Sequence, residues 1–387
     1  MQFDVELAVD GTTLITVTTQ QYLYSEEDLS TVLNSYTHLL KTLSSKPSLP
    51  IKDQSVFSVK DAHTALAIGT GPRINIDQSI TINRMFDWAV KARSNNVAVV
   101  DNVGGQLTWI EMASWVSTIS AHLLRLGVKP QAFVGVNCEP SAMSVCYWLA
   151  VLRIGAIYVP LDPSNPVSRL ELIVNDCKPA AIICDEQTWA SAQRSFRVPN
   201  RHIFKLSDMG GRRTHYTEDM SQPEATACVI YTSGTTGTPK GTLLKNSNFV
   251  NHIYGVNKEY NIANGKEVVL QPTNLGFDLS LAQMMQFIAS QGKMVVASLQ
   301  TRTDPMELVK LMVEHQVTYT IVTPSVYSLI LRQDPSLLHQ LTEWRSAFSC
   351  GEPLTSAIVQ QFQKINLPKL RLLNSCGMYL ECSSTYA

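Results

Sequence analysis

Apolar runs rich in β-branched residues alternate with stretches of helical periodicity along most of the chain, and this alternation constrains the fold more than any other feature. The runs predicted as strands are 97–100, 133–136, 180–184, 228–231, 268–270, 294–297, 318–322, 347–350 and 370–373. The stretches predicted as helices are 110–126, 141–153, 167–176, 279–290, 305–315 and 355–364. Strands separated by helices pair in parallel, so we expect an α/β fold with a mostly parallel sheet and helices on both faces.

The first 45 residues follow a different pattern. Phe3, Val5 and Leu7 alternate with polar residues before an Asp10-Gly11 turn, which predicts a hairpin. Ser25 precedes an amphipathic stretch, with an acidic residue three positions later, as at a capped helix start. A hairpin and one helix cannot form a core of their own, so residues 1–45 are expected to be the end of another domain. Residues 46–79 lose the periodicity and are predicted to be a linker.

Composition and charge exclude several classes of function. The 387 residues are 45% apolar and 16% charged, and 31 Lys and Arg balance 32 Asp and Glu, so we expect a folded protein with no affinity for nucleic acid or anionic membranes. The longest apolar runs, such as residues 146–152, are too short to span a bilayer. Eight cysteines without a Cys-x-x-Cys pair indicate buried thiols, without disulfides or zinc, in a cytoplasmic protein.

One segment has the composition of an anion-binding loop. YTSGTTGTPKG, from Tyr231 to Gly241, follows an apolar strand and combines five hydroxyl side chains, three glycines and one lysine. Glycines let backbone N–H groups turn toward an anion, hydroxyls add donors, and Lys240 adds a positive charge. The predicted ligand is a polyphosphate. A Walker A loop is excluded because Pro239 occupies the position of its second glycine. A flexible linker is the alternative, which the adjoining apolar strand disfavours.

This segment resembles the signature loop of the adenylate-forming superfamily, which contains acyl-CoA synthetases, luciferases and peptide-synthetase adenylation domains. Further stretches match that superfamily in order; they are LTWIEMA, LAVLRIGAIYVPLDPSNPVSRL, FDLS, TPS and CGEPL. The resemblance covers roughly residues 80–374 and implies a layered αβαβα core. GAIYVPLDP is most similar to nonribosomal peptide synthetase adenylation domains. The leading hairpin, helix and linker resemble the end of a condensation domain in fungal hybrid polyketide–peptide synthases.

The resemblance implies ATP-dependent activation of a carboxylate, which attacks the α-phosphorus and displaces pyrophosphate. The acyl-adenylate then passes to a phosphopantetheine thiol on a carrier protein, so the implied partners are carrier and condensation domains. Lys240 and Thr235 are the implied catalytic residues, since donors at the phosphates stabilise the leaving charge. The implied phosphate-binding residues are Thr232, Ser233, Gly234, Thr235, Thr236, Gly237 and Lys240.

Two other motifs give candidate substrate contacts by the same resemblance. Asp278 in FDLS matches an aspartate that pairs with the substrate α-ammonium, which implies an amino-acid substrate; the alternative is a cap for a helix beginning at Leu279. Gly351, Glu352 and Pro353 in CGEPL match a segment that passes the adenine; the alternative is a strand-to-helix turn with Pro353 at the helix start.

The chain also departs from the superfamily pattern. NSCGMYLE, residues 374–381, replaces a motif whose glutamate holds Mg²⁺, and Glu381 aligns with that glutamate only if one extra residue is allowed. Asn246 stands where relatives usually have histidine. The chain ends at Ala387, before the small domain with the catalytic lysine, so residues 80–387 are expected to be a partial, impaired adenylation core. A stand-alone acyl-CoA or acyl-AMP ligase and a non-catalytic nucleotide-binding remnant remain alternatives.

Overall fold

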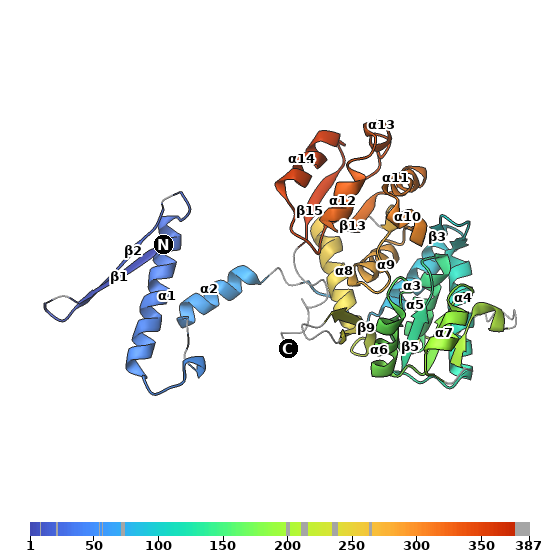
Figure 1. Ribbon diagram of the computed structural model, residues 1–387, viewed down its shortest axis with the longest axis horizontal. Coiled ribbons are helices and arrows are strands. Elements are labelled where there is room, and N and C mark those ends of the chain that lie inside the picture. The colour runs from blue at the N-terminus through green and yellow to red at the C-terminus, as the bar shows by residue number, and fades with distance from the viewer. Residues whose placement is uncertain are drawn as a thin grey trace. The chain divides into compact units, whose positions relative to one another are not determined.

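The computed structural model describes residues 1–7, 9–20, 22–53, 55, 57–70, 74–198, 202–209, 216–233, 239–262 and 265–375. The chain divides into two compact units, residues 1–75 and 76–387. Figure 1 labels helices and strands of each unit. Each unit is described separately below.

The first unit contains the hairpin and the capped helix that the sequence predicts. Strands β1 (Gln2–Leu7) and β2 (Thr13–Thr18) pair antiparallel. Helix α1 (Glu26–Ser45) has Ser25 as its N-cap, and Ser25 and Asp28 exchange the hydrogen bonds of a capping box. A helix that the sequence analysis did not predict, α2 (Val59–Gly69), lies within the expected linker, together with a 3₁₀ turn at Ile51–Asp53.

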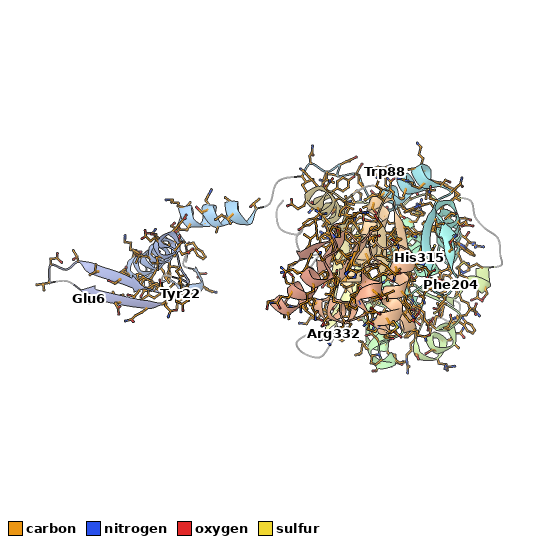
Figure 2. The ribbon with its side chains drawn as sticks, turned by 90° about the horizontal axis from the view of Figure 1, so that it is seen from above. Glu6, Tyr22, Trp88, Phe204, His315 and Arg332 are labelled. Atoms are coloured by element: carbon orange, nitrogen blue, oxygen red, sulfur yellow. The ribbon has the colours of Figure 1, made fainter. Side chains whose placement is uncertain are left out.

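No described residue of the first unit is fully buried. The buried residues of the described chain begin at Ile76, and Tyr22 of the first unit is 81% exposed (Figure 2). Helix α2 begins at an N-cap serine and contains three alanines, a leucine and a lysine, which favour a helix locally without burial. The linker prediction missed it because proline and glycine clusters flank it on both sides.

The second unit contains two sheets rather than one. The seven-stranded sheet has the order β15-β14-β13-β11-β12-β3-β4 and is parallel except for the β3–β4 pair. Its strands are β3 (Val97–Asp101), β4 (Gln106–Thr108), β11 (Val268–Gln271), β12 (Lys293–Val296), β13 (Tyr319–Val322), β14 (Ser346–Ser349) and β15 (Arg371–Asn374).

The six-stranded sheet has the order β10-β9-β6-β5-β7-β8 and is parallel except for the β9–β10 pair. Its strands are β5 (Phe133–Asn137), β6 (Ile157–Pro160), β7 (Ala181–Cys184), β8 (Ile203–Phe204), β9 (Thr226–Ser233) and β10 (Pro239–Lys245).

Helices cover both sheets and fill the space between them. The helices are α3 (Ile82–Arg93), α4 (Trp109–Arg125), α5 (Ala142–Arg153), α6 (Val167–Cys177), α7 (Trp189–Ser195), α8 (Asn246–Tyr260), α9 (Asp278–Ser290), α10 (Leu299–Thr303), α11 (Pro305–Glu314), α12 (Pro324–Ile330), α13 (Pro335–Leu338) and α14 (Ser356–Ile365). Helix α5 contacts β5 and β6 of one sheet and β3 of the other, and α9 packs on β11, β12 and β13.

Two hydrophobic clusters form the outer layers. Helices α6 and α7 pack on the six-stranded sheet through residues such as Ile173 and Ala192. Helices α11 to α14 pack on the seven-stranded sheet around Trp344 and Tyr327. The order of layers is therefore helix, sheet, helix, sheet, helix, which confirms the αβαβα fold. Among the described residues, no helix is both long and apolar enough to cross a bilayer.

All the predicted strands and helices of the second unit are present, with ends shifted by a few residues at most. The core role expected for the helix at 141–153 is also confirmed, since Tyr147 and Trp148 are buried. The elements that the sequence analysis missed are β4, β6, β8, β10, α3, α7, α8, α10, α12 and α13. Most of these are short, and β10 begins with proline, lysine and glycine, which are depleted in strands.

Candidate functional site

A cavity of about 330 Å³ lies where the carboxyl ends of strands from the two sheets meet. Strand β6 ends at Pro160 and β9 at Ser233, and the segment after β11 leads to Asp278 at the start of α9. Loops at the carboxyl ends of parallel strands are the usual ligand sites of α/β folds. The cavity is lined by Pro160, Asn165, Arg169, Ile173, Ile230, Tyr231, Thr232, Thr242, Leu244, Asn274, Gly276, Phe277 and Asp278.

The predicted phosphate loop is shorter than its motif. Tyr231 pairs with Gly241, Thr232 with Lys240 and Ser233 with Pro239, so only residues 234–238 lie between β9 and β10. The sequence analysis treated 231–241 as a loop because it did not predict β10. Cross-strand partners lie on the same face of an antiparallel pair. Lys240 therefore shares the hairpin face of Thr232, which lines the cavity.

Lys240 is exposed, and within the described chain its ammonium has no hydrogen bond or ion pair. The next lysine along β10, Lys245, is instead paired with Glu224 at 3.0 Å. Several predicted site residues lie outside the described residues; these are Gly234, Thr235, Thr236, Gly237 and Glu381. Their roles, and that of the Ser233 side chain, stay predictions.

Helix α6 contacts the strand that leads into the phosphate loop at two points. Arg169 Nη2 donates to the carbonyl of Tyr231 at 3.2 Å, and the Tyr231 hydroxyl donates to Asp176 Oδ2 at 2.6 Å. Burial, and then the hydrogen bond to Asp176, raises the pKa of Tyr231, so the phenol stays protonated. The sequence analysis missed Arg169, which had no signal beyond its place in a helix next to the VPLDP segment.

Asp278 lines the same cavity and is half-buried. It is the first residue of α9, one position earlier than predicted, so the cap hypothesis placed the helix start wrongly; Phe277 is the N-cap residue. Asp278 Oδ1 accepts the Leu279 backbone N–H at 2.9 Å. Burial raises the pKa of Asp278 above its ordinary value. Among the described residues no cation forms an ion pair with this carboxylate.

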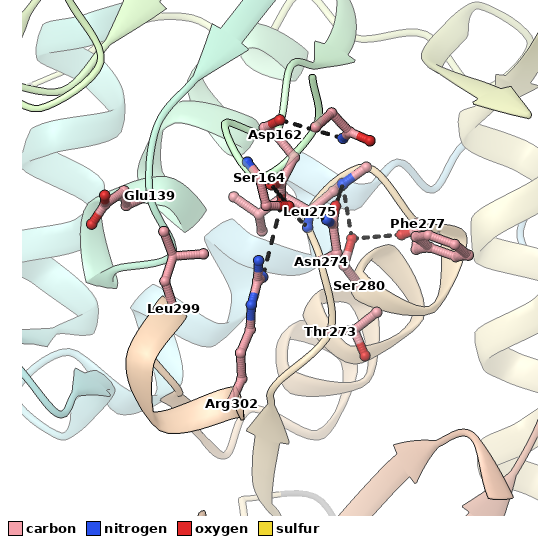
Figure 3. Close-up of polar contacts among 12 residues, drawn as sticks. Glu139, Asp162, Ser164, Thr273, Asn274, Leu275, Phe277, Ser280, Leu299 and Arg302 are labelled. Atoms are coloured by element: carbon pink, nitrogen blue, oxygen red, sulfur yellow. Dashed lines mark hydrogen bonds and ion pairs between the residues drawn. The ribbon is translucent and has the colours of Figure 1, made fainter. Parts of the chain in front are cut away.

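A buried aspartate joins the turns on the two sides of the cavity. Asp162, 1% exposed, accepts the backbone N–H groups of Ser164 at 2.8 Å and Leu275 at 2.9 Å. The Asn274 amide donates to Ser164 Oγ at 2.7 Å. Arg302 lies 3.9 Å from Asp162, and Figure 3 shows its side chain pointing at this cluster. The turn after β6 is thereby bonded to the turn that precedes α9.

The candidate adenine contacts lie at the same edge of the seven-stranded sheet but do not line the cavity. Gly351 follows β14 with φ +82°, and the exposed Glu352 accepts from the backbone N–H of Ser325 at 3.1 Å and from its hydroxyl. Helix α14 begins at Ser356, so Pro353 is not at a helix start and that part of the alternative hypothesis is wrong. Thr355 occupies the N-cap position instead.

The remaining candidates have structural surroundings. Asn246 is buried at the start of α8, where its amide donates to the carbonyl of Gln222 at 3.1 Å. The six described cysteines are buried thiols, and burial raises the pKa of Cys177 and Cys184 to about 12. These two thiols therefore stay protonated at neutral pH. No group of three or more metal-ligating side chains occurs among the described residues.

The comparison with protein families agrees with this architecture. The family model described as AMP-binding enzyme matches residues 86–378, and the chain therefore belongs to that family. The chain is 35% identical over 380 residues to the hybrid PKS-NRPS synthetase LUC5 of Fusarium sp, a match that takes in 97% of this chain. It is 34% identical over 380 residues to the fusarin C synthetase of Gibberella fujikuroi. The chain spans 10% of the length of each of these relatives.

Solved structures share the fold at lower identity. The nonribosomal peptide synthetase FmoA3, in an AMPPNP-bound form, matches 92% of this chain and 38% of its own with a TM-score of 0.76 and 19% identity. VinN in complex with L-aspartate matches 79% of this chain and 81% of its own with a TM-score of 0.65 and 19% identity.

Proposed function

We propose that this chain contains the core of an adenylation unit that activates an amino acid with ATP. An oxygen of the substrate carboxylate attacks the α-phosphorus, the bond from that phosphorus to the bridging oxygen breaks, and pyrophosphate leaves. The acyl-adenylate then transfers its acyl group to the thiol of phosphopantetheine on a carrier protein, and AMP leaves. The carrier and condensation domains of a larger synthetase are the proposed partners.

One observation carries the proposal, namely the cavity that has the phosphate-loop hairpin on one side and Asp278 on the other. Thr232 and Lys240 stand on one face of the hairpin, where hydroxyl and ammonium donors can hold phosphate oxygens. Asp278 supplies a half-buried carboxylate without a cation within the described chain. An α-ammonium group supplies the missing charge, which favours an amino acid over a fatty or aryl acid.

The domain assignment is part of the proposal. Residues 1–45 are the end of a condensation-like domain, 46–79 a linker and 80–387 the adenylation core. The match to a multidomain synthetase takes in 97% of this chain, so it includes most of the first unit. Magnesium and phosphopantetheine belong to the proposal through the family alone, since Glu381, the proposed Mg²⁺ ligand, lies outside the described residues.

The test measures AMPPNP binding by titration calorimetry and amino-acid-dependent ATP–pyrophosphate exchange in a synthetase that carries this chain. Lys240→Ala is expected to slow exchange about 10²–10³-fold, because a donor to the leaving pyrophosphate is lost. The matched control is Lys245→Ala. Lys245 lies on the same strand but on the opposite face and is paired with Glu224, so its variant should change pyrophosphate exchange little.

Asp278→Asn is expected to weaken binding of the amino acid at least about 30-fold while AMPPNP still binds. The substitution removes the charged partner that is proposed for the substrate α-ammonium. Asp304→Asn is the control, since Asp304 also lies at a helix start but does not line the cavity. Unchanged exchange in both Lys240→Ala and Asp278→Asn would show that this cavity is not the site of activation. Exchange that depends on a fatty acid and ignores Asp278→Asn would indicate an acyl ligase instead.

A further inference from the structure

We propose that the two walls of the cavity are held by separate side-chain links. Asp162 holds the wall that carries Asp278, and Arg169 together with Asp176 holds the wall that carries Thr232. Asp162 and Asp176 do not line the cavity, and Arg169 lines it but bonds the Tyr231 carbonyl, so all three act as positioning residues for the neighbouring groups. The assignment of one wall to the amino acid and the other to ATP rests on the proposed function, whereas the links themselves do not.

The first link crosses from the six-stranded sheet to the seven-stranded sheet. Asp162 follows β6, and its Oδ2 accepts the backbone N–H of Leu275, three residues before Asp278. A carboxylate that is 1% exposed is stable only with such partners, and Arg302 at 3.9 Å adds an opposite charge. The turn before α9 therefore depends on a charge supplied by the other sheet.

The backbone around Leu275 is held by two more hydrogen bonds. Asn274 donates to Ser164 Oγ at 2.7 Å, and its own Oδ1 accepts the Gly276 N–H at 2.8 Å. Residues 274–276 are thus bonded both to the turn after β6 and to each other (Figure 3). Because α9 begins two residues later, the position of the Asp278 carboxylate follows from these bonds.

The second link stays within the six-stranded sheet and its outer helix. Arg169 and Asp176 are seven residues apart on α6, so they lie on the same helix face. They bond opposite ends of one residue: Arg169 donates to the Tyr231 carbonyl, and Asp176 accepts from the Tyr231 hydroxyl. Tyr231 immediately precedes Thr232, so these bonds fix the strand where the hairpin enters the cavity.

Among the residues that the structure describes, the two links have no bonding partner in common. Asp162 bonds residues of the turns at 162–164 and 274–276, whereas the α6 pair bonds only Tyr231 among the cavity residues. A variant that removes one link should therefore loosen one wall and leave the other intact. A single rigid core that held both walls together would respond to either variant as a whole.

The experiment is hydrogen–deuterium exchange on the full 387-residue chain, with Asp162→Asn and Tyr231→Phe compared against the unaltered chain. Asp162→Asn should speed amide exchange at 274–279 about tenfold, the factor expected for the loss of one charged hydrogen bond, and leave 229–232 unchanged. Tyr231→Phe should give the reverse pattern. Asp176→Ala, which removes the acceptor of the same bond from an exposed position, should match Tyr231→Phe.

The matched control is Asp101→Asn. Asp101 is also a buried turn aspartate that accepts backbone N–H groups, from Gly105 at 2.6 Å and Ala142 at 2.9 Å, but it does not line the cavity. Its variant should speed exchange near 103–105 and in neither wall. If Asp162→Asn does not fold, Asn274→Ala removes the other bond between the turns and should give the same local pattern.

Ligand measurements then separate this inference from the proposed function. Tyr231→Phe should raise the dissociation constant of AMPPNP about tenfold and leave the response to amino acids unchanged. Asp162→Asn should raise the half-saturating concentration of a mixture of proteinogenic L-amino acids in pyrophosphate exchange about tenfold and leave AMPPNP binding unchanged. If either variant loosens both walls, the separate links are disproved. If the walls loosen separately while the ligand effects do not divide, the links stand and the proposed assignment of the walls is wrong.

Discussion

Helices α1 and α4 begin in the same way and end in different environments. Each has a capping box, formed by Ser25 and Asp28 in α1 and by Thr108 and Glu111 in α4. Helix α4 buries eight residues and α1 buries none. A cap and an amphipathic pattern are therefore enough to specify a helix, but they do not give it a core to pack against. The stability of the two units should differ accordingly.

Aromatic pairs show the same contrast at equal distance. Phe3 and Tyr36 in the first unit have ring centroids 4.7 Å apart, as do Trp109 and Phe287 in the second. Phe3 is 37% exposed, whereas Trp109 and Phe287 are fully buried. The contact between two rings alone contributes about 0.5–1.5 kcal/mol to the free energy of unfolding. Removal of a buried ring from water makes the larger contribution.

Truncation of these rings is expected to have the largest effect on stability. Trp109→Ala should lower the free energy of unfolding of the second unit by about 3–5 kcal/mol, because it leaves a cavity among packed helices. Tyr36→Ala should cost the first unit about 1 kcal/mol or less. All six tryptophans lie between residues 88 and 344, so tryptophan fluorescence in a denaturant titration reports the second unit, and amide exchange in α1 reports the first. Equal costs would contradict the comparison.

Removal of the two caps is expected to have an intermediate effect. Ser25→Ala and Thr108→Ala should each destabilise their helix by about 1 kcal/mol, since each leaves backbone N–H groups without a partner. Only Thr108→Ala should move the unfolding midpoint measured by fluorescence, because α4 is packed into the core. Ser25→Ala should instead increase amide exchange at 26–30. A shift of the fluorescence midpoint by Ser25→Ala would show that α1 is coupled to the core.

The smallest expected effect is on the pH dependence of stability, where the pKa shifts of Asp28 and Asp278 have opposite directions. The Ser25 side chain and then its backbone N–H lower the pKa of Asp28, so its contribution to α1 is present above the ordinary aspartate pKa of about 3.9 and is lost as pH falls through the lowered value. Burial raises the pKa of Asp278, so its charged form costs stability as pH rises above about 3.9.

At neutral pH, Asp28→Asn should therefore reduce the helicity of α1, while Asp278→Asn should raise the melting temperature of the second unit. Both differences should shrink at about pH 3, where ordinary aspartates are mostly protonated. Circular dichroism and calorimetry at the two pH values measure them. A melting temperature that Asp278→Asn lowers at neutral pH would show that a cation outside the described residues already pairs with this carboxylate.

The sequence predicted much of the site because its strongest signals are local. The hydroxyl and glycine motif, Lys240 and Asp278 each stand out in a short stretch of residues next to a strand or a helix start. Asp162 and Arg169 gave no such signal, because their partners are Leu275 and Tyr231, which are more than 60 residues away in the chain. A bond of this kind depends on how the sheets pack, which a pattern of nearby residues does not contain.

The sequence by itself determined where most strands and helices begin, that Ser25 caps α1 and which loop is rich in anion donors, since these depend on neighbours a few residues apart. Only the tertiary structure decided that the strands form two sheets, that 231–241 is mostly paired strand, and that Thr232 and Asp278 line one cavity. The physical reason is that burial and long-range hydrogen bonds arise only when distant segments pack together.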